Sequence, residues 1–302
     1  MLVRVPKAPE ERLWFFYTVS LLAALPFWMA GVLPLNFIPL SGQHPYPSLI
    51  ITLFSVWMMT CYVERRPFSS LGLRFRVDTL VYLFLGFLAA FVTNVLIRWL
   101  IFASYLRFPT WPFITLVFPG EQPFAIVQQV AISVYEELYF RSYALQTLIT
   151  IIGTTPALLV TSFFFGVLHP PGWIYKAIAA LLGIVMSMLY VRTRSLWMSI
   201  GFHFGWNFTS TFVEFPISGG SVAVGWEVSF ASHAFILGLL LVLVWKLPLR
   251  PHPRDRELWD RYVKPAPWPP WRRPPRSGQS KPGPSTETEG SQSPSTETEH
   301  SA

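Results

Sequence analysis

Six polar side chains that can transfer protons or donate hydrogen bonds lie inside long apolar stretches of the sequence. They are Glu136, Glu137, Arg141, His169, His203 and Asn207. An Arg or Asp at the centre of a membrane-spanning helix costs about 2.5–3.5 kcal/mol on insertion scales, and adjacent carboxylates also repel each other. Such residues need charged partners or a water-filled cavity, so they mark a candidate functional site.

The spacing of the first three residues gives the two carboxylates different surroundings. Glu137 and Arg141 stand at positions i and i+4, which share one helical face, so we expect them to form an ion pair. Glu136 is rotated by about 100 degrees from Glu137 and is free to face another group. A structural ion cluster that holds helices together is the alternative interpretation of a Glu–Arg pair, and the additional Glu136 favours the functional one.

The two histidines of the set lie where they can meet a reacting group. His169 directly precedes Pro-Pro-Gly at 170–172, which ends the helix and can admit water. His203 and Asn207 stand at i and i+4, so two hydrogen-bond donors can converge on one oxygen. Each feature taken alone is also typical of a hydrogen bond between helices.

The composition places the chain in a lipid bilayer. Only 13% of the residues are charged and 17% are aromatic, whereas roughly a quarter are charged in soluble domains. The net charge of +7 comes mostly from loops and termini, so we assign it to membrane topology and anionic lipid and expect no nucleic acid partner. Cys61 is the only cysteine, which excludes an intrachain disulfide.

Apolar runs recur with short connections from the N-terminus to about residue 249. A spanning helix needs about 20 apolar residues, so the sequence predicts an all-α membrane bundle with about eight transmembrane helices. These cover approximately residues 13–34, 46–63, 78–104, 122–150, 155–169, 174–191, 196–214 and 230–247. Gly201 and Gly205, four residues apart on the seventh segment, indicate a face for close helix packing.

Basic residues gather at alternate ends of these segments and predict their orientation. They are Arg4, Lys7, Arg12, Arg65, Arg66, Arg74, Arg76, Arg192, Arg194, Lys246 and Arg250. Cytoplasmic loops are enriched in Lys and Arg, so we expect both termini to be cytoplasmic. Arg98, Arg107 and Lys176 oppose this pattern because they lie near the other face.

The composition changes after residue 248. Residues 1–248 are predicted to form one membrane domain, whereas 249–302 are rich in Pro, Ser and Thr and contain few aliphatic residues. Prolines prevent regular helix, and a segment that buries little apolar surface does not fold. We therefore expect residues 249–302 to form a disordered tail.

Taken in chain order, the polar groups form a pattern that is more specific than any one of them. The segments Glu136-Glu137-x-x-x-Arg141, Phe165-x-x-x-His169 and His203-x-x-x-Asn207 resemble the three motifs of the CAAX protease and bacteriocin-processing family. All motif positions match over about residues 120–210. The chain is thereby similar to type II CAAX prenyl endopeptidases.

This resemblance implies an intramembrane endopeptidase that cleaves near the C-terminus of a prenylated or hydrophobic peptide or protein. Glu136 and His169 would activate the attacking water, with Glu136 as the general base. His203 and Asn207 would donate hydrogen bonds to the tetrahedral oxyanion. Glu137 and Arg141 would support the site, and no cofactor would be needed.

Other functions remain open at this point. His169, His203 and a carboxylate could bind a divalent metal that lowers the pKa of a water, although Asn207 is a poor zinc ligand. A second alternative is a non-catalytic membrane scaffold or bacteriocin-immunity protein that uses the polar cluster structurally. Proton-coupled transport fits less well, because the polar residues gather at one place and do not cross the bilayer.

Overall fold

The structure is a computed structural model, and it describes residues 10–16, 18, 46–105, 114–117, 125–169, 172–215 and 225–263. Within these residues the chain is almost entirely helical. The helical elements are α2 (Tyr46–Trp57), η1 (Met58–Val63), η2 (Phe68–Leu71), α3 (Val77–Ser104), α4 (Ala125–Glu137), η3 (Leu138–Ala144), α5 (Leu145–Ile152), α6 (Thr154–Val167), α7 (Trp173–Thr193), α8 (Leu196–Phe212), α9 (Trp226–Lys246) and α10 (Pro253–Tyr262). The elements η1 and η3 are π-helical and η2 is a 3₁₀ turn.

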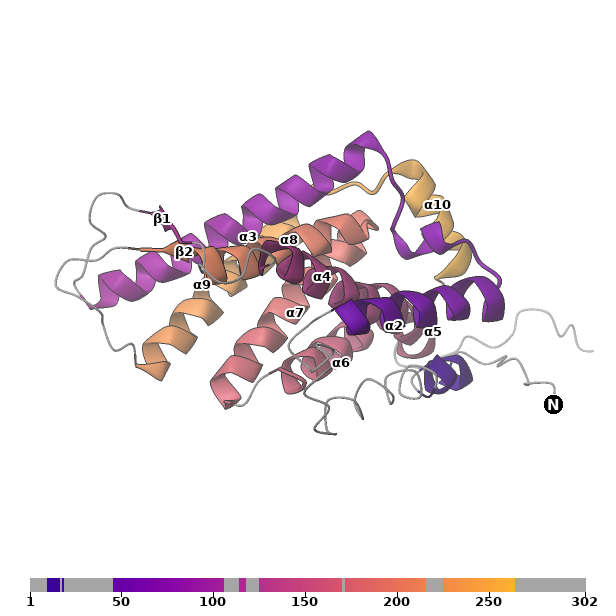
Figure 1. The fold of residues 1–302 in the computed structure, drawn as a ribbon, viewed down its shortest axis with the longest axis horizontal. Coiled ribbons are helices and arrows are strands. Elements are labelled where there is room, and N and C mark those ends of the chain that lie inside the picture. The colour runs from indigo at the N-terminus through magenta and orange to yellow at the C-terminus, as the bar shows by residue number, and fades with distance from the viewer. Residues whose placement is uncertain are drawn as a thin grey trace, which may run out of the picture.

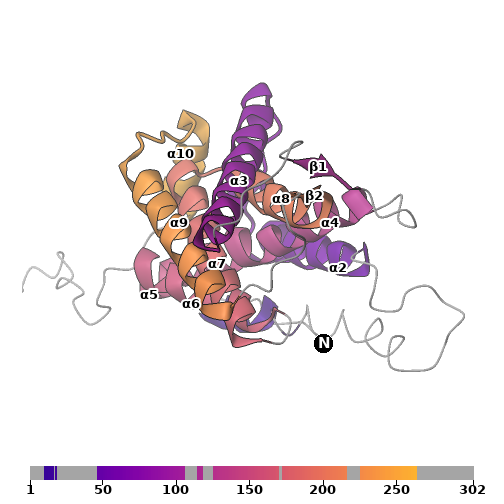
Figure 2. The ribbon, with the colours of Figure 1, turned by 90° about the vertical axis from the view of Figure 1, so that its left-hand side faces the viewer.

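The helices form one bundle with distinct ends (Figure 1). Helix α10 lies at one end, and two short antiparallel strands, β1 (Thr115–Leu116) and β2 (Val213–Glu214), pair at the other. Figure 2 shows α9 on one side of the bundle and α2 on the opposite side, with α7 and α8 between them. Helix α8 packs against α3, α4 and α7, so it lies at the centre of the packing.

Glycines bring the backbones of α3 and α8 into direct contact. A Cβ atom added at Gly201 would collide with the carbonyl oxygen of Leu83, and one added at Gly205 would lie 2.6 Å from that of Phe87. A Cβ atom at Gly86 would meet the backbone of α8 in the same way. The predicted close-packing face at Gly201 and Gly205 is confirmed, and α3 is the helix that it contacts.

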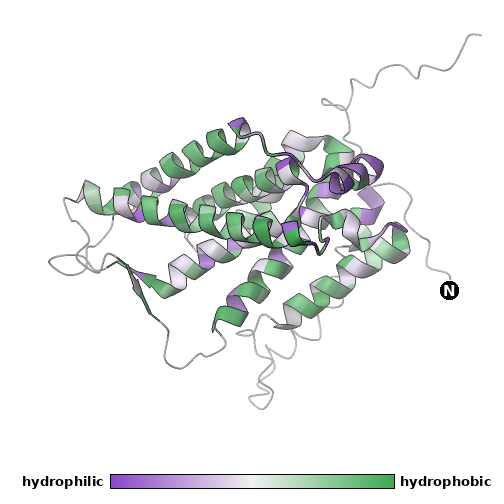
Figure 3. Ribbon diagram, turned by 90° about the horizontal axis from the view of Figure 1, so that it is seen from above, coloured by the Kyte–Doolittle hydropathy of each residue, from purple (hydrophilic) through white to green (hydrophobic). Residues whose placement is uncertain are grey.

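The outer surface of the bundle is apolar. Three described helices, α3, α7 and α9, are long and apolar enough to cross a membrane. Large hydrophobic side chains such as Phe84 on α3 and Phe235 on α9 are more than half exposed, at 61% and 57%. Figure 3 shows hydrophobic residues along the long helices and a strongly hydrophilic α10 at one end. The predicted all-α membrane bundle is confirmed.

The predicted helix count stays a prediction. Each predicted segment from 46–63 onward contains an observed helix, but the segment 13–34 lies mostly outside the described residues. Helix α6 has 14 residues, which is shorter than the usual span. The seventh predicted segment also ends early, because Val213–Glu214 form strand β2.

The expected disordered tail is wrong for its first part, because Pro253–Tyr262 form helix α10. Pro253 occupies the first turn, where its missing N–H costs nothing, and the side chain of His252 caps the helix by accepting a hydrogen bond from Arg254 N. Trp259 is only 4% exposed and lies under the guanidinium of Arg194, at 3.8 Å from ring centre to Cζ. The composition of residues 249–302 did not indicate that Trp259 would be buried or that a helix would form around it. Residues 264–302 lie outside the described residues.

The contact between α3 and α8 predicts a specific cost for added volume. The substitution Gly201→Ala should lower the free energy of unfolding in detergent by about 1–3 kcal/mol, because the new methyl group meets backbone atoms that cannot rotate away. Chemical unfolding followed by circular dichroism measures this change. The control is Gly238→Ala on α9, where an added Cβ has no atom within 4 Å. Equal stability of the two variants would contradict this account of the packing.

Candidate active site

A buried ion pair anchors the site on α4 and η3. Glu137 and Arg141 are 0% and 1% exposed, and Arg141 Nη1 lies 3.2 Å from Glu137 Oε1. The guanidinium also lies over the ring of Phe165, at 4.1 Å. The helix widens into the π-helical turn η3 directly after Glu137, and such turns are frequent at functional sites. The ion pair expected from the i, i+4 spacing is present.

Two side chains of α8 also bind the Glu137 carboxylate. His203 Nδ1 lies 3.0 Å from Glu137 Oε1, and Ser199 Oγ donates a short hydrogen bond to Oε2. An ionised carboxylate only accepts hydrogen bonds, so Nδ1 of His203 carries the proton. These contacts fix the imidazole and direct its other nitrogen, Nε2, away from Glu137.

Glu136 lines a cavity, whereas the neighbouring Glu137 is fully buried. Its side chain is 18% exposed, and Tyr135 Oη donates a hydrogen bond of 3.2 Å to Oε1. Its other oxygen, Oε2, has no hydrogen-bond partner among the described residues and lies 3.8 Å from His203 Nε2. That separation is too long for a direct hydrogen bond. A small molecule lying off the line between the two atoms could contact both.

His169 lies just beyond the end of α6. Its Nδ1 donates a hydrogen bond of 2.6 Å to the carbonyl oxygen of Phe165, because a carbonyl can only accept. In the tautomer with the proton on Nδ1, Nε2 is the acceptor. The Phe165 ring contacts both imidazoles, with centroid distances of 4.4 Å to His169 and 5.9 Å to His203.

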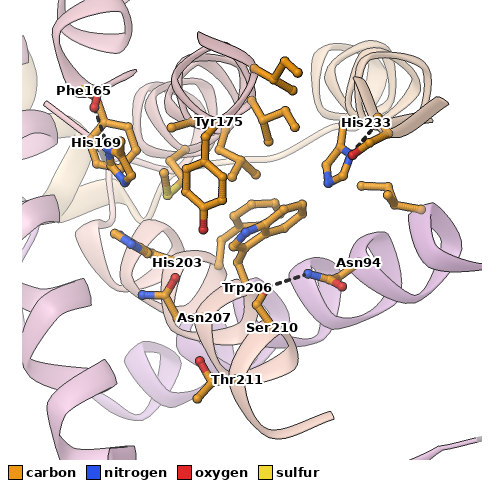
Figure 4. Close-up of a pocket in the computed structure, with 18 of the residues that line it drawn as sticks. Asn94, Phe165, His169, Tyr175, His203, Trp206, Asn207, Ser210, Thr211 and His233 are labelled. Atoms are coloured by element: carbon orange, nitrogen blue, oxygen red, sulfur yellow. Dashed lines mark hydrogen bonds between the residues drawn. The ribbon is translucent and has the colours of Figure 1, made fainter. Parts of the chain in front are cut away.

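One cavity of about 900 Å³ brings the predicted chemical groups together. Glu136, His169, His203 and Asn207 all line it. Figure 4 shows His203 and Asn207 projecting side by side from α8, with His169 facing the same region. Glu137 and Arg141 lie behind this wall and do not line the cavity. The structure thus separates the six residues into four that face the cavity and two that support them.

A metal centre would need several ligands close together. Among the residues that the structure describes, no group of three or more His, Cys, Asp and Glu side chains is arranged to hold a metal ion. Nδ1 of His169 and Nδ1 of His203 each bind a protein oxygen, which leaves Nε2 of both rings free to contact a ligand. Metal binding by His169, His203 and a carboxylate therefore stays a prediction.

Several contributing residues escaped the sequence analysis. Ser199 stands four residues before His203 on the same helical face, a spacing that could have indicated their shared carboxylate. Tyr135, adjacent to Glu136, carries no comparable signal. The cavity also continues to His233, to which the sequence analysis assigned no role, and to Arg98, which was an exception to the charge pattern.

The comparison with protein families agrees with this geometry. Residues 119–209 match the family described as Type II CAAX prenyl endopeptidase Rce1-like. Comparison with curated proteins gives no match. The matched segment contains all six predicted site residues, from Glu136 to Asn207. Residues 119–209 are therefore an Rce1-like domain, as the three motifs predicted.

Proposed function

We propose that this protein is an intramembrane endopeptidase that hydrolyses a peptide bond with a water activated by Glu136 and His169. The Rce1-like domain supports a CAAX-type protease function at the level of the family. The observation that carries the proposed mechanism is the shared cavity, where the free oxygen of Glu136 lies 3.8 Å from His203 Nε2. The mechanism uses protein side chains alone.

Glu136 serves as the general base. Glu136 lines the cavity, and its Oε2 has no hydrogen-bond partner among the described residues, so this oxygen can accept a proton from water. Tyr135 holds the other oxygen and thereby fixes the direction of the carboxylate. His169 presents Nε2 as a second acceptor, because its Nδ1 proton is used at Phe165. A water between the two acceptors is oriented with its lone pairs toward the substrate.

His203 and Asn207 stabilise the oxyanion. A donor at His203 Nε2 must carry a proton, and the Glu137 carboxylate at Nδ1 stabilises the resulting imidazolium. The amide of Asn207, one turn further along α8, supplies the second donor. Arg141 and Ser199 act through Glu137, so they are positioning residues.

The reaction balances without any further reactant. Water oxygen attacks the carbonyl carbon while a proton passes to Glu136, and His203 and Asn207 hold the oxyanion. The tetrahedral intermediate then collapses, the C–N bond breaks, and Glu136 returns the proton to the departing amine nitrogen. The products are a new carboxylic acid, which keeps the second proton of the water, and a new amine, so the base is regenerated.

The membrane and an apolar peptide are the partners that suit this site. Cavity walls built from helices of an apolar bundle favour a hydrophobic or lipidated peptide over a soluble one. We also propose that the end of the bundle that carries α10 faces the cytoplasm. Arg74 pairs with Asp255 of α10 at 3.3 Å, and Arg192 donates to the carbonyl of Leu247 at the end of α9, so basic residues gather at this end of the bundle.

Replacement of the base tests the catalytic role. Glu136→Gln should lower kcat for a hydrophobic peptide by about 10²–10⁴-fold, because the amide cannot accept the proton. Cleavage by the purified protein is followed by mass spectrometry. The matched control is Glu257→Gln, an exposed Glu on α10 that should keep full activity. A scaffold that uses the cluster structurally would instead give no Glu136-dependent turnover at all.

Replacement of the supporting carboxylate should give a different result. Glu137→Gln should reduce both the thermal midpoint and kcat, because Arg141 is left as a buried charge without its partner. Ser199→Ala removes one hydrogen bond to Glu137 and should lower kcat by roughly tenfold or less, with little change in stability. If Glu137→Gln lowered neither quantity, the positioning role would be wrong.

The proposed orientation can be tested with a single engineered thiol. Arg254 on α10 has 55% of its side chain exposed, so Arg254→Cys in a Cys61→Ala background offers one reactive site. A membrane-impermeant maleimide should label inverted vesicles and leave intact cells unlabelled. Labelling of intact cells would place α10 on the outer face.

A further inference from the structure

Arg98 of α3 presents a positive charge to the cavity near the end of the bundle where β1 and β2 pair. We propose that Arg98 and the polar groups around it bind the phosphate group of a membrane phospholipid. This phosphate site uses residues that the three motifs do not include. It does not depend on the proposed peptidase function, because a bound phospholipid takes no part in the reaction.

Protein contacts hold the Arg98 guanidinium in place. Arg98 Nε donates to Asn94 Oδ1 at 2.9 Å, and Asn94 Nδ2 donates to Ser210 Oγ at 3.1 Å. The ring of Phe215 lies 5.1 Å from Arg98 Cζ. The two terminal nitrogens of Arg98 have no hydrogen-bond partner among the described residues. A guanidinium presents its N–H groups in a planar fork, which fits two oxygens of one phosphate.

The charge of Arg98 is not balanced by a carboxylate, in contrast to that of two buried arginines of the bundle. Arg141 pairs with Glu137. Arg66 pairs with Glu64. No carboxylate of the described residues lies within ion-pair distance of Arg98. A guanidinium in a membrane protein is costly without an anion, so an anionic ligand offsets this cost.

Two further polar groups face the same part of the cavity. Ser210 accepts a hydrogen bond from Asn94, and its own hydroxyl proton remains available to a ligand. His233 Nδ1 donates to the carbonyl of Ser229 at 2.6 Å, so Nε2 can donate to an anion when the ring is protonated. Figure 4 shows His233 and Asn94 on the side of Trp206 away from the proposed water site. These groups can hold the phosphate oxygens that Arg98 does not contact.

Helix α3 places Arg98 at the depth of lipid headgroups. The helix begins at Val77, 21 residues before Arg98, and a rise of 1.5 Å per residue gives about 30 Å between them. The hydrocarbon core of a bilayer is also about 30 Å thick. If the start of α3 lies at one membrane interface, Arg98 therefore lies at the other, where phospholipid phosphates are found.

Tryptophans mark the same interface on three helices. Trp99 of α3, Trp173 of α7 and Trp226 of α9 are 41%, 61% and 51% exposed. The rings of Trp173 and Trp226 also contact each other, with centroids 5.2 Å apart. Tryptophan is enriched at the boundary between lipid and water, so these side chains support the depth assigned to Arg98.

The walls next to the phosphate site favour a lipid over free phosphate. Ile97, Ile101 and Phe102 line the cavity from α3, and Leu182 lines it from α7. An acyl chain would remove this apolar surface from water, whereas inorganic phosphate can only neutralise the charge. A cavity of about 900 Å³ leaves room for part of such a chain. The site therefore suits a phosphate that carries an acyl chain.

The test compares three ligands on the unmodified full-length protein in detergent. They are phosphatidylglycerol, a diacylglycerol with the same acyl chains, and inorganic phosphate. Native mass spectrometry measures the dissociation constant of the first molecule bound. Phosphatidylglycerol should bind at least about tenfold more tightly than either of the others, because hydrogen bonds to charged groups are the strong ones.

Variants assign this preference to the phosphate site. Arg98→Gln should remove the preference for phosphatidylglycerol over diacylglycerol, and Arg98→Lys should restore part of it, because Lys keeps the charge but lacks the planar fork. The matched control is Arg76→Gln, which removes one charge at the other end of α3 and should keep the preference.

Three results would overturn the proposal. The first is equal binding of phosphatidylglycerol and diacylglycerol to the unmodified protein, a comparison that needs no variant and so does not depend on the folding of Arg98→Gln. The second is an equal loss of preference in Arg98→Gln and Arg76→Gln, which would indicate general attraction of anionic lipid to a basic protein. The third is binding of inorganic phosphate as tight as that of phosphatidylglycerol, which would exclude a lipid as the source of the phosphate.

Discussion

The arrangement of this site depends on one buried carboxylate. Glu137 is fully buried in an apolar bundle, where an unpaired negative charge would be strongly unfavourable. Arg141 forms an ion pair with it, and His203 and Ser199 donate hydrogen bonds to its two oxygens. These partners come from η3 and α8, so the need to satisfy this charge fixes α8 relative to η3 and sets the direction of the His203 imidazole.

Close backbone packing makes this convergence possible. Gly201 and Gly205 allow α8 to approach α3, and His203 lies between them on the helix. The same helix then carries Asn207 along the cavity and reaches Ser210 at its polar far end. One helix therefore carries the two proposed oxyanion donors and a third polar side chain of the cavity wall, Ser210.

Sequence reasoning predicted the features that follow from local spacing. The Glu137–Arg141 pair and the glycine face of α8 both follow from i, i+4 geometry, and both are present. The bond from His203 to Glu137 joins residues 66 positions apart, and no local rule specifies which carboxylate the imidazole meets. The sequence analysis treated Arg98 only as an exception to the charge pattern, whereas the structure places Arg98 in the wall of the cavity. Helix α10 was missed because its prolines and charges outweighed Trp259, which is buried by tertiary contacts such as the one with Tyr190 of α7.

The central claim is that Glu136 and His169 act on the same water, and a double-mutant cycle on single-turnover cleavage tests it most directly. The variants are Glu136→Gln, His169→Ala and the two combined, all checked for an unchanged thermal midpoint. Groups that act as a unit are strongly non-additive, so the double variant should cleave about as slowly as the slower single variant. Independent losses that multiply in the double variant, or undiminished cleavage in either single variant, would contradict the account.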